Sequence, residues 1–188
     1  MHRKLWNQNV LYPLVEKTSL EVHPSLNPKL WTEKEVLRSD VQDHMLRAAD
    51  KFREYAKIPK NAVKGIIFVG SNTTKYFTSA SDIDIHILIN RSILGNIPEE
   101  VEEYALTKKN LWLRDHSTLK IYGYPLEFYI QDITTKFPKG QGVWDLLHSR
   151  WIQKASPQKL DINDPHLALK VKHLTHYINF LIKTNAPD

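Results

Sequence analysis

The chain contains no cysteine, so disulfide bridges, zinc–thiolate sites and cysteine nucleophiles are all excluded. Its first six residues lack the apolar core of a secretory signal peptide. No apolar run approaches the roughly 20 residues that a membrane-spanning helix needs. These absences predict a cytoplasmic protein with no membrane partner.

Internal repeats, low-complexity tracts and long linkers are missing as well. A length of 188 residues suits one domain that spans the whole chain. Weak periodicity over about residues 1–31 predicts an irregular N-terminal arm, either extended or packed irregularly against the core. A regular apolar pattern over about 165–184 predicts a C-terminal helix.

The excess of positive charge is small, with 26 Lys and Arg residues against 21 Asp and Glu residues. Many soluble domains carry such a charge without any polyanionic partner. The same charge suits a nucleotide or a nucleic acid, and the sequence alone does not show where the lysines gather. Both interpretations therefore stay open.

Hydrophobic periodicity and helix-start signals predict alternating helices and strands. A first helix begins at Thr32 or Ser39, which both open a capping-box pattern, and ends before Pro59. The later predicted elements are strands at 65–69 and 82–90, a helix at 97–109, strands at 118–122 and 124–131, a short helix at 142–151 and the final helix. This order predicts an α/β (α+β) fold in which helices flank a mixed β-sheet.

The apolar run at 66–69 ends in Gly70 and Ser71. Glycine lets the backbone approach a phosphate closely, and the serine offers a hydroxyl and an N–H group to it. A phosphate-binding loop is therefore expected here. Lys75, in the spacer that follows, is a candidate phosphate contact, although a loop lysine is more often only solvated.

Two carboxylates follow in a strand-like segment where polar residues alternate with isoleucines. Asp82 and Asp84 stand two residues apart, so both project from one face of the strand, together with His86. Carboxylates gathered on one surface repel each other unless a divalent cation joins them. The alternative is the solvated face of an edge strand, where acids are harmless.

A third acid, Glu127, lies in the predicted strand at 124–131, which is rich in aromatic and aliphatic residues. Alternation places Leu126, Phe128 and Ile130 toward the core and Glu127 on the opposite face. The case for Glu127 depends on pairing between its strand and the Asp82/Asp84 strand. The sequence does not establish that pairing.

Together these residues resemble the DNA polymerase β-type nucleotidyltransferase superfamily. The shared features are Gly-Ser, a spacer of ten residues, Asp-x-Asp between apolar residues, and a later acid on another strand. The chain is also similar, over about 26–152, to small predicted nucleotidyltransferases of bacteriophage genomes. The matching segments are 26–30, 40–41, 70–72, 81–87, 121–131 and 142–144. The chain departs from larger relatives in having little room for a separate acceptor-binding domain.

The resemblance implies an enzyme that transfers NMP from an NTP, ATP among them, to an acceptor hydroxyl. The resemblance does not identify the acceptor, which could be RNA, a small molecule or a protein. If the chain is phage-encoded, the enzyme would act in the host cytoplasm. The resemblance further implies Mg²⁺ or Mn²⁺ as cofactor and a role for Glu127 in deprotonating the acceptor. The implied catalytic and metal-binding residues are Asp82, Asp84 and Glu127, and the implied nucleotide-binding residues are Gly70, Ser71 and Lys75.

Two other functions are alternatives to nucleotidyl transfer. A catalytically silent nucleic-acid-binding or regulatory protein could share the fold, but a decayed site would be expected to lose one of its carboxylates. A pyrophosphotransferase of the guanosine-tetraphosphate type would use a single Asp and a Glu, which fits the Asp-x-Asp pair less well. Asp115 and Asp132 are the spare acids if Glu127 fails, and His173 and His176 form the one helical histidine pair at ligand spacing.

Overall fold

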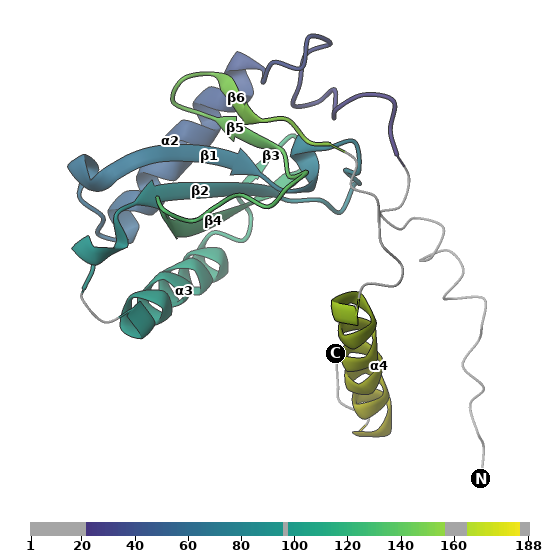
Figure 1. The fold of residues 1–188 in the computed structure, drawn as a ribbon. Helices are drawn as coiled ribbons and strands as arrows, with labels where there is room; N and C mark the ends of the chain where they lie inside the picture. The colour runs from purple at the N-terminus through teal and green to yellow at the C-terminus, as the bar shows by residue number, and fades with distance from the viewer. Residues whose placement is uncertain (1–21, 96–97, 157–164, 185–188) are drawn as a thin grey trace. The chain divides into compact units, whose positions relative to one another are not determined.

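A mixed β-sheet organises the larger part of this protein, whose computed structural model describes residues 22–95, 98–156 and 165–184. Within these residues six strands form one sheet in the order β3-β4-β2-β1-β5-β6 (Figure 1). The strands are β1 (Val63–Val69), β2 (Ile83–Ile89), β3 (Lys120–Ile121), β4 (Tyr124–Asp132), β5 (Val143–Asp145) and β6 (Arg150–Gln153). The chain divides into two units, 1–156 and 157–188, and the sheet belongs to the first.

Strands β2 and β4 pair in parallel, whereas all other neighbours in the sheet are antiparallel. A parallel connection needs a crossover, and α3 (Pro98–Asp115) supplies it between β2 and β4. The register of this pair sets Asp84 opposite Glu127. The predicted α+β fold with a mixed, helix-flanked sheet is confirmed.

Helices α2 (Ser39–Tyr55) and α3 pack against the sheet (Figure 1). The alternating isoleucines of β2 are buried in the same hydrophobic core as residues of these helices. Phe52 of α2 stacks on Phe128 of β4 with ring centroids 5.0 Å apart. Trp112 of α3 meets both rings edge-on. Because even and odd residues of a strand point to opposite faces, burying the isoleucines presents Asp84 and Glu127 on the other face.

The segment before α2 packs into the core instead of forming an extended arm. Leu30 and Trp31 are buried, and the Trp31 ring stacks on Trp151 with centroids 4.7 Å apart. Of the two alternatives for the N-terminal segment, residues 22–31 therefore show irregular packing against the core, while residues 1–21 lie outside the described part. Apolar side chains explain this packing, since Leu26, Leu30 and Trp31 all belong to the hydrophobic core.

The predicted short helix at 142–151 is wrong, because this stretch forms the β5–β6 hairpin. Trp144 pairs with Phe68 of β1 and is almost fully buried, which fixes the stretch as a strand. The Asp145 carboxylate accepts the N–H groups of Leu147 and His148 and closes the turn. Helix α2 begins at Ser39, the second of the two predicted starts, whereas α3 continues past Lys109, where the predicted helix ended.

The second unit contains α4 (Pro165–Thr184), and this confirms the predicted C-terminal helix. Several of its apolar side chains are exposed, among them Leu169, Val171 and Leu174. Among the described residues no helix is long and apolar enough to cross a membrane.

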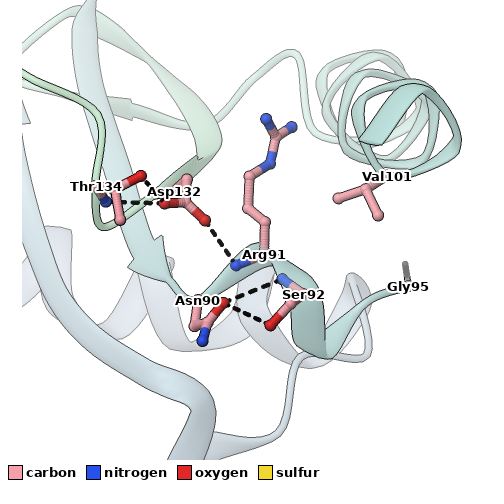
Figure 2. Close-up of a pocket in the computed structure, with 7 residues that line it drawn as sticks. All are labelled: Asn90, Arg91, Ser92, Gly95, Val101, Asp132 and Thr134. Atoms are coloured by element: carbon pink, nitrogen blue, oxygen red, sulfur yellow. Dashed lines mark hydrogen bonds between the residues drawn. The ribbon is translucent and has the colours of Figure 1, made fainter. Parts of the chain in front are cut away.

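A pocket of about 430 Å³ lies where β2 and β4 end (Figure 2). Its lining residues are Asn90, Arg91, Ser92, Gly95, Val101, Asp132 and Thr134. The strand register places it five residues beyond the Asp84–Glu127 pair. At about 3.3 Å per residue, the two places are roughly 16 Å apart along the strands.

Candidate active site

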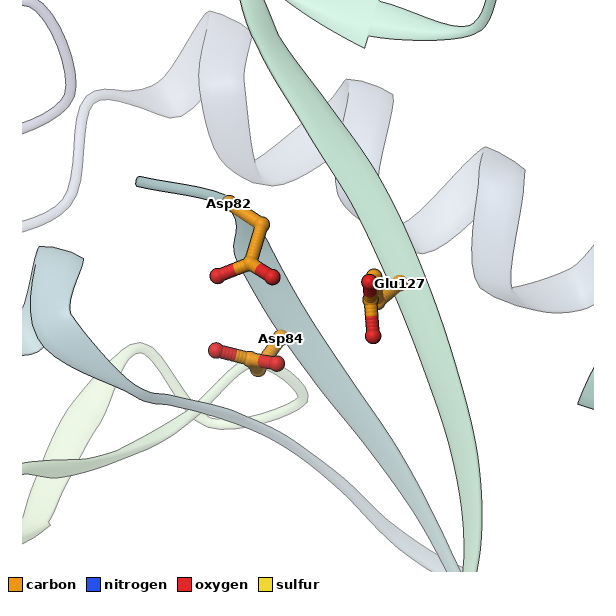
Figure 3. A group of neighbouring side chains, drawn as sticks. All are labelled: Asp82, Asp84 and Glu127. Atoms are coloured by element: carbon orange, nitrogen blue, oxygen red, sulfur yellow. The ribbon is translucent and has the colours of Figure 1, made fainter. Parts of the chain in front are cut away.

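Three carboxylates meet on the face of the sheet that the helices leave open. Asp82 directly precedes β2, Asp84 lies within it, and Glu127 comes from the adjacent β4 (Figure 3). One oxygen from each residue lies within 4.8 Å of the others. The adjacency that the sequence left open is thus present, because the parallel register sets Asp84 beside Glu127. The catalytic roles of these residues stay predictions.

Burial and neighbouring negative charges raise the pKa of Asp84 to about 7. Burial of the carboxyl contributes most, followed by the negative charges of Asp82 and Glu127. Asp84 therefore tends to hold a proton near neutral pH when no cation is bound.

Glu127 behaves differently because it has two donors. Lys109 Nζ lies 2.8 Å from Glu127 Oε2, and the Tyr129 hydroxyl donates to the same oxygen at 2.8 Å. Burial works against ionisation, but these hydrogen bonds and the Lys109 charge hold the pKa of Glu127 below its usual range. Glu127 therefore stays charged at neutral pH.

Sequence reasoning missed Lys109, although a signal for it exists. Val101, Ala105 and Trp112 form the buried stripe of α3, and position 109 continues the same helical spacing. A lysine on the packed stripe of a helix needs a charged partner. The signal was lost because the helix was expected to fade at this residue.

The backbone at Gly70 touches the carboxylate group directly. Gly70 has φ +84°, and a Cβ added there would lie 2.0 Å from Asp84 Oδ2. Glycine is therefore required for two reasons, the left-handed backbone and the approach of Asp84. The Ser71 hydroxyl donates to Ser81 Oγ at 2.7 Å, which ties the loop to the residue before Asp82. Phosphate binding by Gly70 and Ser71 stays a prediction.

A buried asparagine fixes this loop to β2. The Asn72 amide accepts from Asn27 Nδ2 at 2.8 Å and donates to the backbone oxygen of Asp82 at 2.7 Å. Its own backbone oxygen accepts from the Trp31 indole. Because amide and backbone partners are all satisfied, the loop and Asp82 are held in one arrangement. Sequence reasoning assigned no role to Asn27 or Asn72.

Lys75 lies in contacts of a different kind. Its ammonium group donates to the backbone oxygen of Pro24 at 2.8 Å, and its backbone oxygen accepts from His23 N. It holds the segment before α2 against the loop. A contact of Lys75 with phosphate stays a prediction that would require it to leave Pro24.

His86 extends the polar face away from the acids. Its ring hydrogen-bonds Gln131 Oε1 and lies beside the Tyr129 ring, with centroids 4.5 Å apart. Burial lowers the pKa of His86, so the imidazole is neutral at physiological pH. Asp115 instead pairs with Arg114, and Asp132 accepts the N–H of Arg91. Within the described residues, no other His, Asp or Glu joins a three-membered group that could hold a metal.

The donor set fits a hard divalent cation. Three carboxylate oxygens within 4.8 Å of one another match the span across one or two oxygen-ligated ions, about 4–5 Å. Burial and the negative charges of Asp82 and Glu127 raise the pKa of Asp84, so its charged form is unfavourable without a cation. A divalent cation held by Asp82, Asp84 and Glu127 would neutralise this repulsion.

Comparisons with known proteins add little to this geometry. No protein-family model matches the chain, and no curated protein matches it. Among solved structures the chain is similar to the STING-associated CdnE c-di-GMP synthase from Capnocytophaga granulosa, with 12% identity and a TM-score of 0.30. The match covers 65% of this chain and 44% of that one, so the chain spans less than half of the synthase. At this TM-score the likeness does not bear on the chemistry of the site.

Proposed function

We propose that the protein is a metal-dependent nucleotidyltransferase that transfers NMP from an NTP to an acceptor hydroxyl. One observation carries the proposal. Asp82, Asp84 and Glu127, from neighbouring parallel strands, present oxygens within 4.8 Å of each other on an open sheet face. The Gly70–Ser71 turn abuts this group, as a phosphate-binding loop would need to do.

In the proposed reaction each site residue has a role that follows from its surroundings. Asp82, Asp84 and Glu127 would hold Mg²⁺ or Mn²⁺, which when bound neutralises triphosphate charge and lowers the pKa of the acceptor hydroxyl. The Gly70 and Ser71 backbone would orient the phosphates. Glu127 stays ionised beside Lys109 and would accept the acceptor proton or fix the acceptor's position.

Label transfer tests the proposal. The full chain is incubated with each α-labelled NTP, Mg²⁺ or Mn²⁺, and RNA, small molecules or cell lysate. Metal-dependent label on an acceptor, lost in Asp84→Asn, supports transfer. Nucleotide or RNA binding without any transfer by the wild type would favour the silent binding protein instead.

A further inference from the structure

Both hydrogen-bond donors to Glu127 reach the same oxygen atom. Lys109 Nζ approaches Oε2 from α3, and the Tyr129 hydroxyl approaches it from two residues along β4. Two charge-assisted hydrogen bonds on one carboxylate oxygen use its available lone pairs. The other oxygen, Oε1, has no such pair of donors.

The two donors also hold each other in place. The Lys109 ammonium lies 3.7 Å from the centroid of the Tyr129 ring, and the lysine side chain is 17% exposed. A cation close to an aromatic face, where little water intervenes, is attracted by the negative face of the ring. Lysine, tyrosine and glutamate therefore form a closed set in which Glu127 has little freedom to rotate.

A carboxylate held in this way is a ligand with one free oxygen. Ca²⁺ takes six to eight oxygens and accepts carboxylates in bidentate fashion, whereas Mg²⁺ demands six ligands in near-ideal octahedral geometry. We propose that Lys109 and Tyr129 restrict Glu127 to one-oxygen ligation and so set the preference of the site for Mg²⁺ or Mn²⁺ over Ca²⁺. This inference rests on the metal site of the proposed function.

The ratio of two affinities isolates this geometric effect. The Lys109 charge repels every divalent cation at the site, so its removal shifts the affinities for Mn²⁺ and Ca²⁺ in the same direction. Only a change in the ligation mode of Glu127 shifts their ratio. A purely structural role for Lys109 would leave the ratio unchanged.

The experiment titrates Mn²⁺ and Ca²⁺ into the full-length protein by calorimetry, with bound Mn²⁺ also counted by electron paramagnetic resonance. The variants are Lys109→Met, Tyr129→Phe and Lys109→Arg. Lys108→Met is the matched control, because Lys108 leaves the same helix but lies over the Tyr55 and Tyr104 rings. Circular dichroism and the melting temperature check that each variant is folded.

We expect Lys109→Met to lower the ratio Kd(Ca²⁺)/Kd(Mn²⁺) by about tenfold, in the range of other outer ligand-supporting contacts. Tyr129→Phe lowers it less, Lys109→Arg recovers most of it because the donors remain, and Lys108→Met leaves it unchanged. If the wild type binds both ions but no variant changes the ratio, the inference fails while the metal site stands. If the wild type binds neither ion, the metal site and the inference fail together. Should Lys109→Met not fold, Tyr129→Phe alone decides by the same ratio.

Discussion

The two ends of the β2–β4 strand pair each carry acidic residues, yet these acids lie in opposite surroundings. At one end Asp84 faces Asp82 and Glu127, and its pKa is raised to about 7. At the other end Asp132 accepts hydrogen bonds from Thr134 and from the N–H of Arg91 (Figure 2). Those hydrogen bonds, the Thr134 side chain first, lower the pKa of Asp132.

The difference separates an acid whose charge the fold satisfies from acids whose charge it does not. Asp132 has donors from its own turn and from Arg91 after β2, so its charge needs nothing from outside the fold. The three acids at the other end share two donors, Lys109 and Tyr129, and both serve Glu127. A cluster with unmet negative charge, held on a rigid sheet, is a candidate site for a cation and for chemistry.

The largest expected effect contrasts the two ends directly. Asp84→Ala should lower nucleotidyl transfer by about a thousandfold or more, because it removes a ligand that positions both metal and triphosphate. Asp132→Ala is the control from the opposite end and should retain transfer within a few-fold. Label transfer measures both, with circular dichroism to confirm folding. Equal activity of Asp84→Ala and the wild type would remove Asp84 from the site.

A smaller effect is expected from Glu127, which differs from Asp84 within the same group. Glu127→Gln keeps an acceptor for Lys109 and Tyr129 but loses the charge, so turnover should fall by about a hundredfold. Binding of a non-hydrolysable NTP, measured by calorimetry, should change little, because the change affects the acceptor side. Glu54→Gln, on the exposed surface of α2, is the control carboxylate. If Glu127→Gln keeps wild-type turnover, Glu127 has no role in catalysis and is only a solvated strand residue.

The sequence predicted the faces of the strands better than their partners. Alternation with buried isoleucines placed Asp82 and Asp84 on one surface, and this follows from the two-residue period of any strand. That Glu127 lies beside Asp84 depends on a parallel pairing across α3, which no local pattern encodes. Lys109 is a different case, because the helical spacing of α3 places it on the packed stripe but its partner Glu127 is 18 residues away in the sequence.

The β5–β6 hairpin shows a second limit. Its strands are three and four residues long, too short for a period of 2 to be told from a period of 3.6. Packing decides there, because Trp144 needs the core beside Phe68. The same packing requires Gly142 just before β5, because an added Cβ there would lie 2.4 Å from the Thr73 backbone oxygen.

The pH dependence of stability also distinguishes the two ends. Because the folded pKa of Asp84 is about 7 and its ordinary value is 3.8, the folded protein holds a proton that the unfolded chain has lost between these pH values. The free energy of unfolding without metal should therefore fall as pH rises through this window, by at most about 1.4 kcal/mol per pH unit. Denaturant unfolding at several pH values measures it, and Asp84→Asn should flatten the curve.

Asp132 gives the opposite sign in the same experiment. Its folded pKa is lowered, so its stabilising effect is present above the ordinary value of 3.8 and is lost as pH falls through the folded pKa.

A metal ion should remove the effect of Asp84. Millimolar Mn²⁺ should raise the free energy of unfolding near pH 8 in the wild type and not in Asp84→Asn. A wild-type curve that is flat between pH 4 and 7 and unaffected by Mn²⁺ would show that Asp84 is not electrostatically strained.

The smallest effect comes from comparing two glycines, one at the acid cluster and one away from it. Gly70 and Gly123 have similar positive φ values of +84° and +92°. An added Cβ meets Asp84 Oδ2 at 2.0 Å in the first case and nothing within 4 Å in the second. Gly123→Ala should therefore cost about 1 kcal/mol for the backbone alone. Gly70→Ala should lower the free energy of unfolding by about 1 kcal/mol more and also weaken Mn²⁺ binding, because Asp84 must move.

Denaturant unfolding and Mn²⁺ calorimetry measure the two effects. If both variants lose the same stability and Gly70→Ala binds Mn²⁺ as the wild type does, the contact between Gly70 and Asp84 plays no part in shaping the site.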